Sequence, residues 1–115
     1  MITTEVKHLM KKSGDEGRCE TMLAITQSLL AAVGISMSEA QWLSLVSHLS
    51  AMVYRSVNND PIPPVDKGMF QEVSAESIEL AAKVCEMLPE LHEDEKYLLS
   101  IHFESAKITN EMKEE

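Results

Sequence analysis

The sequence predicts an all-α fold, a single domain built as a bundle of five helices, and three observations support this. The chain has 115 residues, 44% hydrophobic and 25% charged, which is enough for one core and too few for two. Only 4% of the residues are aromatic while methionine occurs eight times, and such a composition suits packed helices better than strands. Apolar residues also recur at spacings of three and four between Gly and Pro breaks, which is the period of a helix.

The N-terminal part of the chain divides into an arm and a first helix. Residues 1–15 have weak apolar periodicity, so we expect a loosely ordered N-terminal arm followed by one helical domain over 16–115. The first helix is expected near 19–33, and Gly34 is placed to end it. Its apolar stripe consists of Cys19, Met22, Leu23, Thr26, Leu29, Leu30 and Val33.

A second helix is expected near 38–58. The segment Ser36-Met37-Ser38-Glu39 matches the S-x-x-E capping box that begins many helices. The helix should end at Asn58-Asn59-Asp60-Pro61, and the prolines that follow predict a loop inside the domain. Its apolar stripe consists of Trp42, Leu45, Val46, Leu49, Met52, Val53 and Val57.

Three further helices complete the predicted bundle. A short one is expected near 65–73, and a longer one near 74–88 begins with Ser74 as its cap. The last is expected near 93–111, because the acidic start Glu93-Asp94-Glu95 suits the positive end of a helix dipole. The connections between these helices are short, as is typical of a bundle.

Charge and cysteine content exclude several classes of protein. The formal net charge is −9, which argues against direct binding to nucleic acid or to an anionic membrane. No segment reaches the roughly 18 apolar residues that would span a bilayer, and no signal peptide is recognisable. Cys19 and Cys85 fall in step with apolar neighbours, which favours buried thiols over a redox pair. We therefore expect a cytoplasmic protein.

Common catalytic signatures are missing. There is no phosphate-binding Gly-rich loop, no H-E-x-x-H and no G-x-S-x-G. A di-iron bundle needs two Glu-x-x-His motifs, and only Glu5-Val6-Lys7-His8 fits. The run Glu93-Asp94-Glu95 is more often a solvated helix start than a metal site, and His92 is expected to belong to the same cap. The sequence thus predicts no catalytic residue, no cofactor, no metal and no enzyme activity.

The informative residues are His48 and His102. At 100° per residue, each lies at the edge of its helix's apolar stripe, with Arg55 seven residues after His48 and Glu95 seven before His102. Seven residues is too far for a contact within one helix. If the two helices pack together, Arg55 and Glu95 could each reach the other helix's histidine. We therefore predict a shared, partly accessible groove lined by all four residues. The alternative is that both histidines are half-buried and held only by hydrogen bonds.

The same residues resemble a known family. His48-Leu49-Ser50-Ala51-Met52-Val53-Tyr54-Arg55 resembles the H-[LI]-x5-R signature of the phosphotransferase-system regulation domain, or PRD. Asp94-Glu95-Lys96-Tyr97-Leu98-Leu99-Ser100-Ile101-His102 resembles its later D-E-x-x-x-[LI]-x-x-H signature. The resemblance covers roughly residues 30–108. Together and in this order, the two motifs are considerably more specific than either alone.

The resemblance implies a PRD-like five-helix bundle, often dimeric, of the kind found in bacterial antiterminators and transcription activators of sugar operons. In that family, phosphocarrier proteins phosphorylate histidines. The matching positions are His48 and His102, while Arg55 and Glu95 match the charged partners. The implied partners are a phosphocarrier protein or sugar-permease subunit, a second copy of the chain, and a separate regulator protein.

Three functions remain open at this point. The first is a regulatory module whose histidines accept a phosphoryl group and which modulates transcription through a partner. The second is a dimerising or adaptor protein that has lost phosphorylation. The third, and least favoured, is a metal-dependent helical enzyme using His48, His102 and Glu95.

Overall fold

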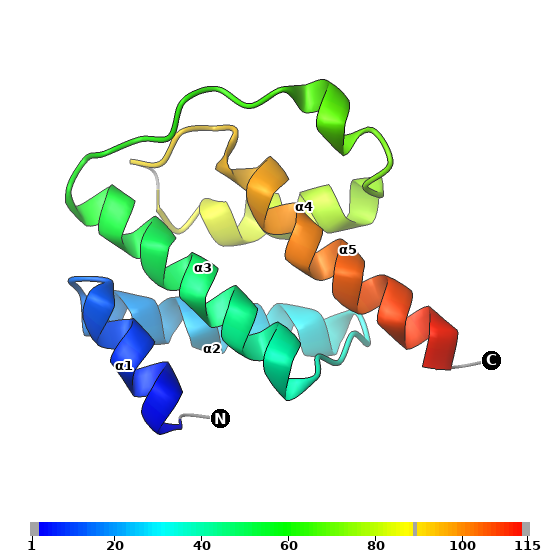
Figure 1. Ribbon diagram of the computed structural model, residues 1–115, viewed down its shortest axis with the longest axis horizontal. Helices are drawn as coiled ribbons and strands as arrows, with labels where there is room; N and C mark the ends of the chain where they lie inside the picture. The colour runs from blue at the N-terminus through cyan, green and yellow to red at the C-terminus, as the bar shows by residue number, and fades with distance from the viewer. Residues whose placement is uncertain (1–2, 89, 114–115) are drawn as a thin grey trace.

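The computed structural model describes residues 3–88 and 90–113, which form two layers of helices (Figure 1). The elements in chain order are α1 (Thr4–Lys12), α2 (Glu16–Ala32), α3 (Glu39–Val57), the 3-10 helix η1 (Lys67–Phe70), α4 (Ala75–Cys85) and α5 (Glu95–Lys113). In Figure 1, α1, α3 and α5 cross the front diagonally and α2 and α4 lie behind them. The described residues contain no strand, and the predicted all-α bundle is confirmed.

Helix α3 is the centre of the bundle. It packs against α1, α2 and α5, and its predicted apolar stripe supplies much of the core. The fully buried members of that stripe are Leu45, Val46, Leu49, Met52 and Val53. Because α3 touches three neighbours, its edge residues lie at helix–helix interfaces, and this positions the site described below.

The N-terminal segment differs from its prediction. Instead of a loose arm over 1–15, the chain forms α1, whose first turn is capped when the Val6 N–H donates to Thr3 Oγ1 at 3.2 Å. Val6 and Met10 are 1% and 4% exposed in the core. Because only these two apolar residues of α1 are fully buried, the sequence shows too few repeats of the helical period to predict a helix. Residues 1–2 lie outside the described residues.

The start of α3 also corrects a prediction. The capping box is formed by Ser38 and Gln41, two residues beyond the predicted Ser36–Glu39 pair. The Gln41 N–H donates to Ser38 Oγ at 3.1 Å, and the Ser38 N–H donates to Gln41 Oε1 at 3.0 Å. Ser36 has a tertiary role, because its N–H donates to Asn110 Oδ1 of α5 at 3.0 Å. Two capping motifs overlap in the sequence, and this contact with α5 distinguishes them.

Two residues with positive φ end α2 and α3. Gly34, at φ 72°, follows α2 as predicted, and Asn59, at φ 51°, follows α3. Glycine adopts this left-handed region freely and asparagine tolerates it. Beyond Asn59, the Asp60 N–H donates to the carbonyl of Arg55 at 2.9 Å. This hydrogen bond closes the last turn of α3 at Arg55, whose side chain belongs to the site described below.

The remaining helices differ from their predictions: two are shorter, and the last has the predicted length but is shifted by two residues. The helix predicted over 65–73 is the four-residue η1, and the helix predicted over 74–88 ends at Cys85. The last helix begins at Glu95 and not at 93. Residue 89, between α4 and α5, lies outside the described residues, as do 114–115. Within the described ranges, no helix is both long and apolar enough to cross a bilayer.

Candidate functional site

The two predicted histidines lie side by side. His48 comes from the middle of α3 and His102 from α5, which runs antiparallel to α3 (Figure 1). Their rings meet edge to face, with centroids 4.9 Å apart and planes at 78°. His48 Nδ1 and His102 Nε2 are 2.9 Å apart, which is hydrogen-bonding distance. The helix spacing thus brings together two imidazoles 54 residues apart in the chain.

Each histidine is held by the core beneath it. Leu45 and Leu49 flank His48 along α3, and Leu99 and Phe103 flank His102 along α5; all four are fully buried. Both histidines are themselves half-buried. This is the edge position that the helical wheel predicts, with part of each ring still accessible.

Burial keeps both rings uncharged near neutral pH. Desolvation, followed by the charges of His102 and Arg55, lowers the pKa of His48 from 6.5 to about 4. Burial also lowers the pKa of His102. A hydrogen bond between two neutral imidazoles needs one N–H and one lone pair. The pair therefore shares a single proton between its facing nitrogens.

Arg55 and Glu95 pair with each other and not with the histidines, which corrects the prediction. Arg55 Nε donates to Glu95 Oε2 at 2.7 Å, and Arg55 Nη2 donates to Glu95 Oε1 at 2.8 Å. The Glu95 side chain is 0% exposed and that of Arg55 is 21% exposed. A buried carboxylate needs a charged partner, and a guanidinium offers two parallel donors where a neutral imidazole offers one.

The facing residues of α3 and α5 form a ladder of three polar pairs. Besides the two pairs above, Gln41 Nε2 donates to Thr109 Oγ1 at 3.2 Å. Successive pairs are seven residues apart on each helix. We call this set the polar ladder, and its rungs are Gln41–Thr109, His48–His102 and Arg55–Glu95. Gln41 lies in the same column as His48 on the helical wheel, but Thr109 carries no comparable signal in the sequence.

A shallow groove of about 530 Å³ lies over the histidine pair. Its walls include both histidines and Arg55, the small side chains Ser44, Ser47 and Ala51, and the apolar Ile62 and Leu98. Three of the four predicted residues therefore line one groove. Glu95 is the exception, because it is fully buried and is absent from the walls. Ile62 comes from the loop after α3, and nothing in the sequence pointed to it.

The start of α5 holds that loop in place. The Val65 N–H donates to Asp94 Oδ2 at 3.2 Å, and the Asp94 side chain is almost fully buried. His92 is part of the same turn as predicted, since its Nδ1 accepts the Asp94 N–H at 3.0 Å. The loop from α3 to η1 is thus tied to the residue that immediately precedes Glu95.

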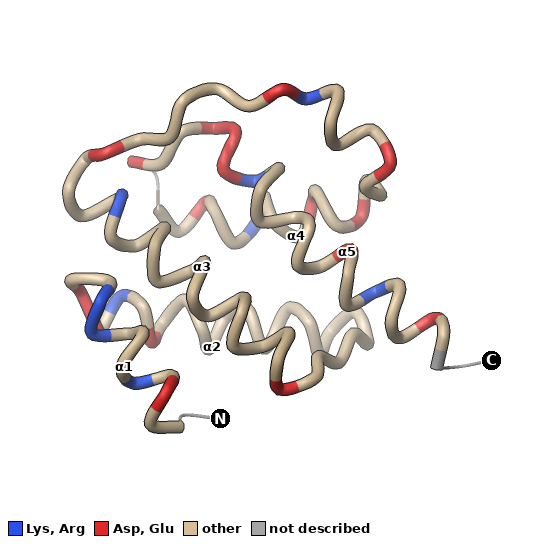
Figure 2. Tube along the Cα trace, viewed as in Figure 1, with Lys and Arg blue, Asp and Glu red and all other residues tan. Residues whose placement is uncertain are grey.

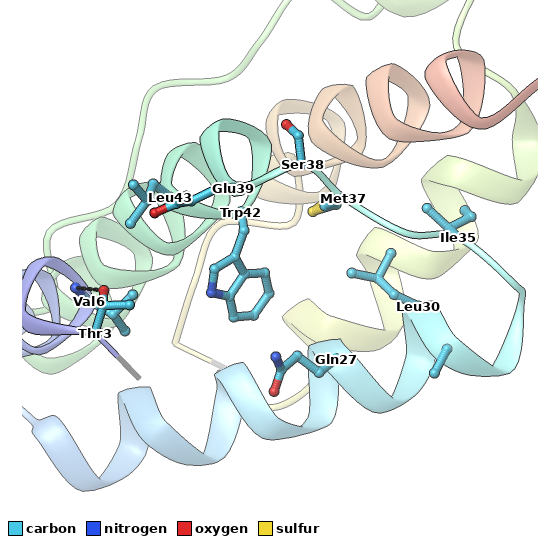
Figure 3. Close-up of a pocket in the computed structure, with 11 residues that line it drawn as sticks. Thr3, Val6, Gln27, Leu30, Ile35, Met37, Ser38, Glu39, Trp42 and Leu43 are labelled. Carbon is cyan, nitrogen blue, oxygen red and sulfur yellow. Dashed lines mark hydrogen bonds between the residues drawn. The ribbon is translucent and has the colours of Figure 1, made fainter. Parts of the chain in front are cut away.

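A second hollow lies on the other side of α3, between α1 and α2 (Figure 3). It has a volume of about 360 Å³, and its wall is mostly apolar, with Leu30, Ile35 and Trp42 prominent in Figure 3. Trp42 is half-buried and packs against the core, as expected. Among the residues that line this hollow, only Glu39 is ionisable. It therefore offers no pair of chemically active groups comparable to the histidines.

Other chemically active residues are dispersed. Burial raises the pKa of Cys19, and burial together with the charge of Glu95 raises the pKa of Cys85 to about 12, so both thiols stay protonated. Glu5 and His8 are exposed on α1. Over residues 3–88 and 90–113, no three His, Cys, Asp or Glu side chains are grouped so as to hold a metal ion.

Comparison with known proteins identifies the family of the chain. The family model of the PRD domain matches residues 23–106, a range that contains both histidines, Arg55 and Glu95. A solved structure of a PRD-containing transcription regulator from Lactobacillus casei ATCC 334 is similar, with a TM-score of 0.87 and 37% identity over 93% of this chain and 96% of that chain. No curated protein matches the sequence. On the family match and on this likeness, the chain belongs to the PRD domain family.

Proposed function

We propose that the chain is a regulatory module of the sugar phosphotransferase system whose histidines accept a phosphoryl group. The donor is a phosphocarrier protein or a sugar-permease subunit, and the acceptors are His48 and His102. The observation that carries the proposal is the hydrogen-bonded histidine pair in an open groove. The PRD match and the likeness to a transcription regulator support a regulatory role.

The chemistry of the groove suits phosphoryl transfer from a protein donor. A neutral imidazole is the nucleophilic form, and the lowered pKa of His48 keeps its ring in that form near neutral pH. Ser44, Ser47 and Ala51 leave room above the rings for the donor's side chain. Arg55 lies in the same wall, where its positive charge stabilises the negative charge of the phosphoryl group.

The phosphoryl group would act on the neighbouring rung of the polar ladder. It adds roughly two negative charges beside Arg55, whose guanidinium now neutralises the buried Glu95. The phosphoryl group and Glu95 then compete for the same guanidinium. Weakening the Arg55–Glu95 rung changes the packing of α3 against α5, and this change is the signal that a partner reads.

The output is expected to pass through a protein partner and not through direct binding to nucleic acid. The chain has ten basic and nineteen acidic residues. In Figure 2 the basic residues are scattered over the helices, apart from a small group where α1 meets α2, and acidic residues gather before α5. Along the described part of the trace, the Lys and Arg positions do not follow one another in a continuous basic stripe of the kind that tracks a phosphate backbone.

Phosphorylation can be tested directly with labelled phosphoenolpyruvate and the phosphocarrier protein that it charges. We expect acid-labile label on His48 and His102, loss of each share in His48→Ala and His102→Ala, and no label in the double variant. His8→Ala is the matched control, since His8 is exposed on α1 and should leave the label unchanged. Circular dichroism should show unaltered helix content in every variant. Absence of label from the intact chain would contradict the proposal and favour the adaptor function.

The adaptor function is kept as the second candidate because α5 carries exposed apolar residues. Ile101, Ile108 and Met112 are 48%, 47% and 69% exposed, and apolar side chains that gather on one surface often mark an interface. We expect a homodimer with a twofold contact through this face, which is the commonest oligomer. The adaptor function and the phosphoacceptor function both accommodate such a dimer.

Light scattering measures the expected dimer. The intact chain should have twice the 12.8 kDa mass of one protomer at high micromolar concentration. Ile101→Glu should give a monomer with full helix content, because a charge would be buried at the contact. Met69→Glu is the control, because Met69 is 78% exposed on η1 and its change should leave the mass unaltered. A monomeric intact chain would exclude this interface.

A further inference from the structure

We propose that the hydrogen bond between the two rings selects the accepting atoms: His48 accepts a phosphoryl group only on Nε2 and His102 only on Nδ1. In the unmodified pair, only one of these two outward nitrogens carries a free lone pair at a time. This inference rests on the proposed phosphoacceptor function and specifies its chemistry.

The first step of the argument is that the inner nitrogens are occupied. His48 Nδ1 and His102 Nε2 face each other at 2.9 Å. One of them must donate its N–H and the other must accept with its lone pair, so neither is free to attack a phosphorus atom. The outward nitrogens, His48 Nε2 and His102 Nδ1, are the atoms not used by this bond, and both residues line the groove.

The second step is that a neutral imidazole has one N–H and one lone pair. If His48 Nδ1 donates, His48 has its free lone pair on Nε2, and His102 carries its proton on the outward Nδ1. If His102 Nε2 donates, the free lone pair is on His102 Nδ1, and His48 carries its proton on the outward Nε2. In both arrangements the two rings are the same tautomer, and one ring alone is the nucleophile.

The third step is the transfer itself. The free outward lone pair attacks the phosphorus of a phosphohistidine on the donor protein. The new N–P bond forms as the donor's N–P bond breaks, and its electron pair returns to the donor ring. That ring, protonated on its other nitrogen, leaves as neutral imidazole. The accepting ring gains a positive charge, which its inner N–H delocalises by donating to the other histidine.

The consequence is that each histidine positions the other. The ring that accepts the inner hydrogen bond fixes the tautomer and orientation of the nucleophile, as a carboxylate does in a catalytic triad. It also has its own outward nitrogen protonated, so it cannot accept a second phosphoryl group in that arrangement. A second transfer requires the inner proton to cross the bond and the outward proton to leave.

The tautomers can be tested without any phosphorylation, by long-range proton–nitrogen NMR of histidine-labelled chain at neutral pH. We expect His48 and His102 to show the same tautomer, or to exchange between the two forms together. His92 serves as the internal reference and should carry its proton on Nε2, because its Nδ1 accepts the Asp94 N–H. Opposite tautomers for His48 and His102 would overturn the proposal.

The accepting atoms can then be mapped with potassium phosphoramidate, a small phosphoryl donor, and separately with the phosphocarrier protein. We expect nitrogen–phosphorus coupling at His48 Nε2 and His102 Nδ1. Label on either inner nitrogen of the intact chain would overturn the assignment. If phosphoramidate labels the outward nitrogens but the carrier protein labels neither residue, the proposed function fails while the assignment is supported.

Matched variants isolate the hydrogen bond. In His48→Asn the amide takes the place of Nδ1 and keeps the bond, so His102 should still accept on Nδ1 alone. In His48→Ala the bond is lost and His102 Nε2 becomes free, so the label on His102 should divide between its two nitrogens. An identical pattern in the two variants would show that the bond does not select the atom.

Discussion

Replacing Arg55 by leucine is expected to lower the free energy of unfolding by about 3–5 kcal/mol, the usual cost of removing one partner from a buried ion pair. The reason is the other partner. Glu95 is 0% exposed, and both of its carboxylate oxygens accept from the Arg55 guanidinium. Without Arg55, the carboxylate must either keep a buried charge or take up a proton. Urea denaturation followed by circular dichroism measures the change.

Two controls separate this effect from loss of charge in general. Glu76→Gln removes an ion pair with Lys107 whose acidic member is 83% exposed, and such surface pairs contribute about 0–1 kcal/mol. The double variant Arg55→Leu with Glu95→Leu should recover most of the loss, since it leaves no unpaired charge. If Arg55→Leu costs no more than Glu76→Gln, the buried pair does not stabilise the fold.

The second large effect is the loss of stability in mild acid that arises from His48. Its pKa is lowered from 6.5 to about 4 in the folded chain, so between these values the unfolded chain binds more protons. Stability therefore falls as the pH falls through this window, and the loss is complete below the folded pKa. This lowering of the His48 pKa corresponds to a decrease in the free energy of unfolding of at most about 3 kcal/mol.

The comparison with His48→Asn isolates this contribution. Asparagine keeps the hydrogen bond to His102 and does not titrate, so the difference in unfolding free energy between the two proteins should shrink towards low pH. The lowered pKa of Glu104 also reduces stability on acidification, but both proteins contain Glu104 and its effect cancels. The measurement is a set of urea titrations from neutral pH to pH 4. Parallel stability curves would show that His48 is not held in its neutral form by the fold.

The sequence predicts which residues of α3 and α5 belong to the site but not which of them pair. The polar residues repeat every seven positions on both helices, so the spacing alone allows registers that differ by seven residues, or about 10 Å along a helix. The prediction that Arg55 would reach His102 corresponds to such a shift. In that register, Glu95 would lie beyond the end of α3 at Val57 and would have no partner on that helix. The observed register pairs the two charged side chains with each other. This pairing depends on how the two helices pack, which the periodicity of a single helix does not reveal.

The sequence misplaced a helix start where two capping motifs overlap, and it missed a helix whose apolar pattern is short. Ser36 and Ser38 each begin an acceptable capping motif, and the contact of Ser36 with Asn110 leaves Ser38 as the cap. Helix α1 has one turn of core contacts, from Val6 to Met10, which is less than the two turns that make a periodic stripe visible. By contrast, most of the predicted stripes of α2 and α3 is buried, because several residues repeat the same period, and only their last members, Val33 and Val57, are exposed.

The polar ladder gives the pair α3–α5 the mechanics of a lever. If a phosphoryl group draws Arg55 away from Glu95, the other two rungs remain, and the nearer one, His48–His102, is a pivot about 10 Å from the loosened end. A small rotation at this pivot becomes a larger displacement at the far end. That end is where the Asp60 N–H closes α3 on the Arg55 carbonyl and where Asp94 holds the loop through Val65. The largest displacement would therefore occur at the loop that borders the groove. A partner bound at this loop would be the most affected.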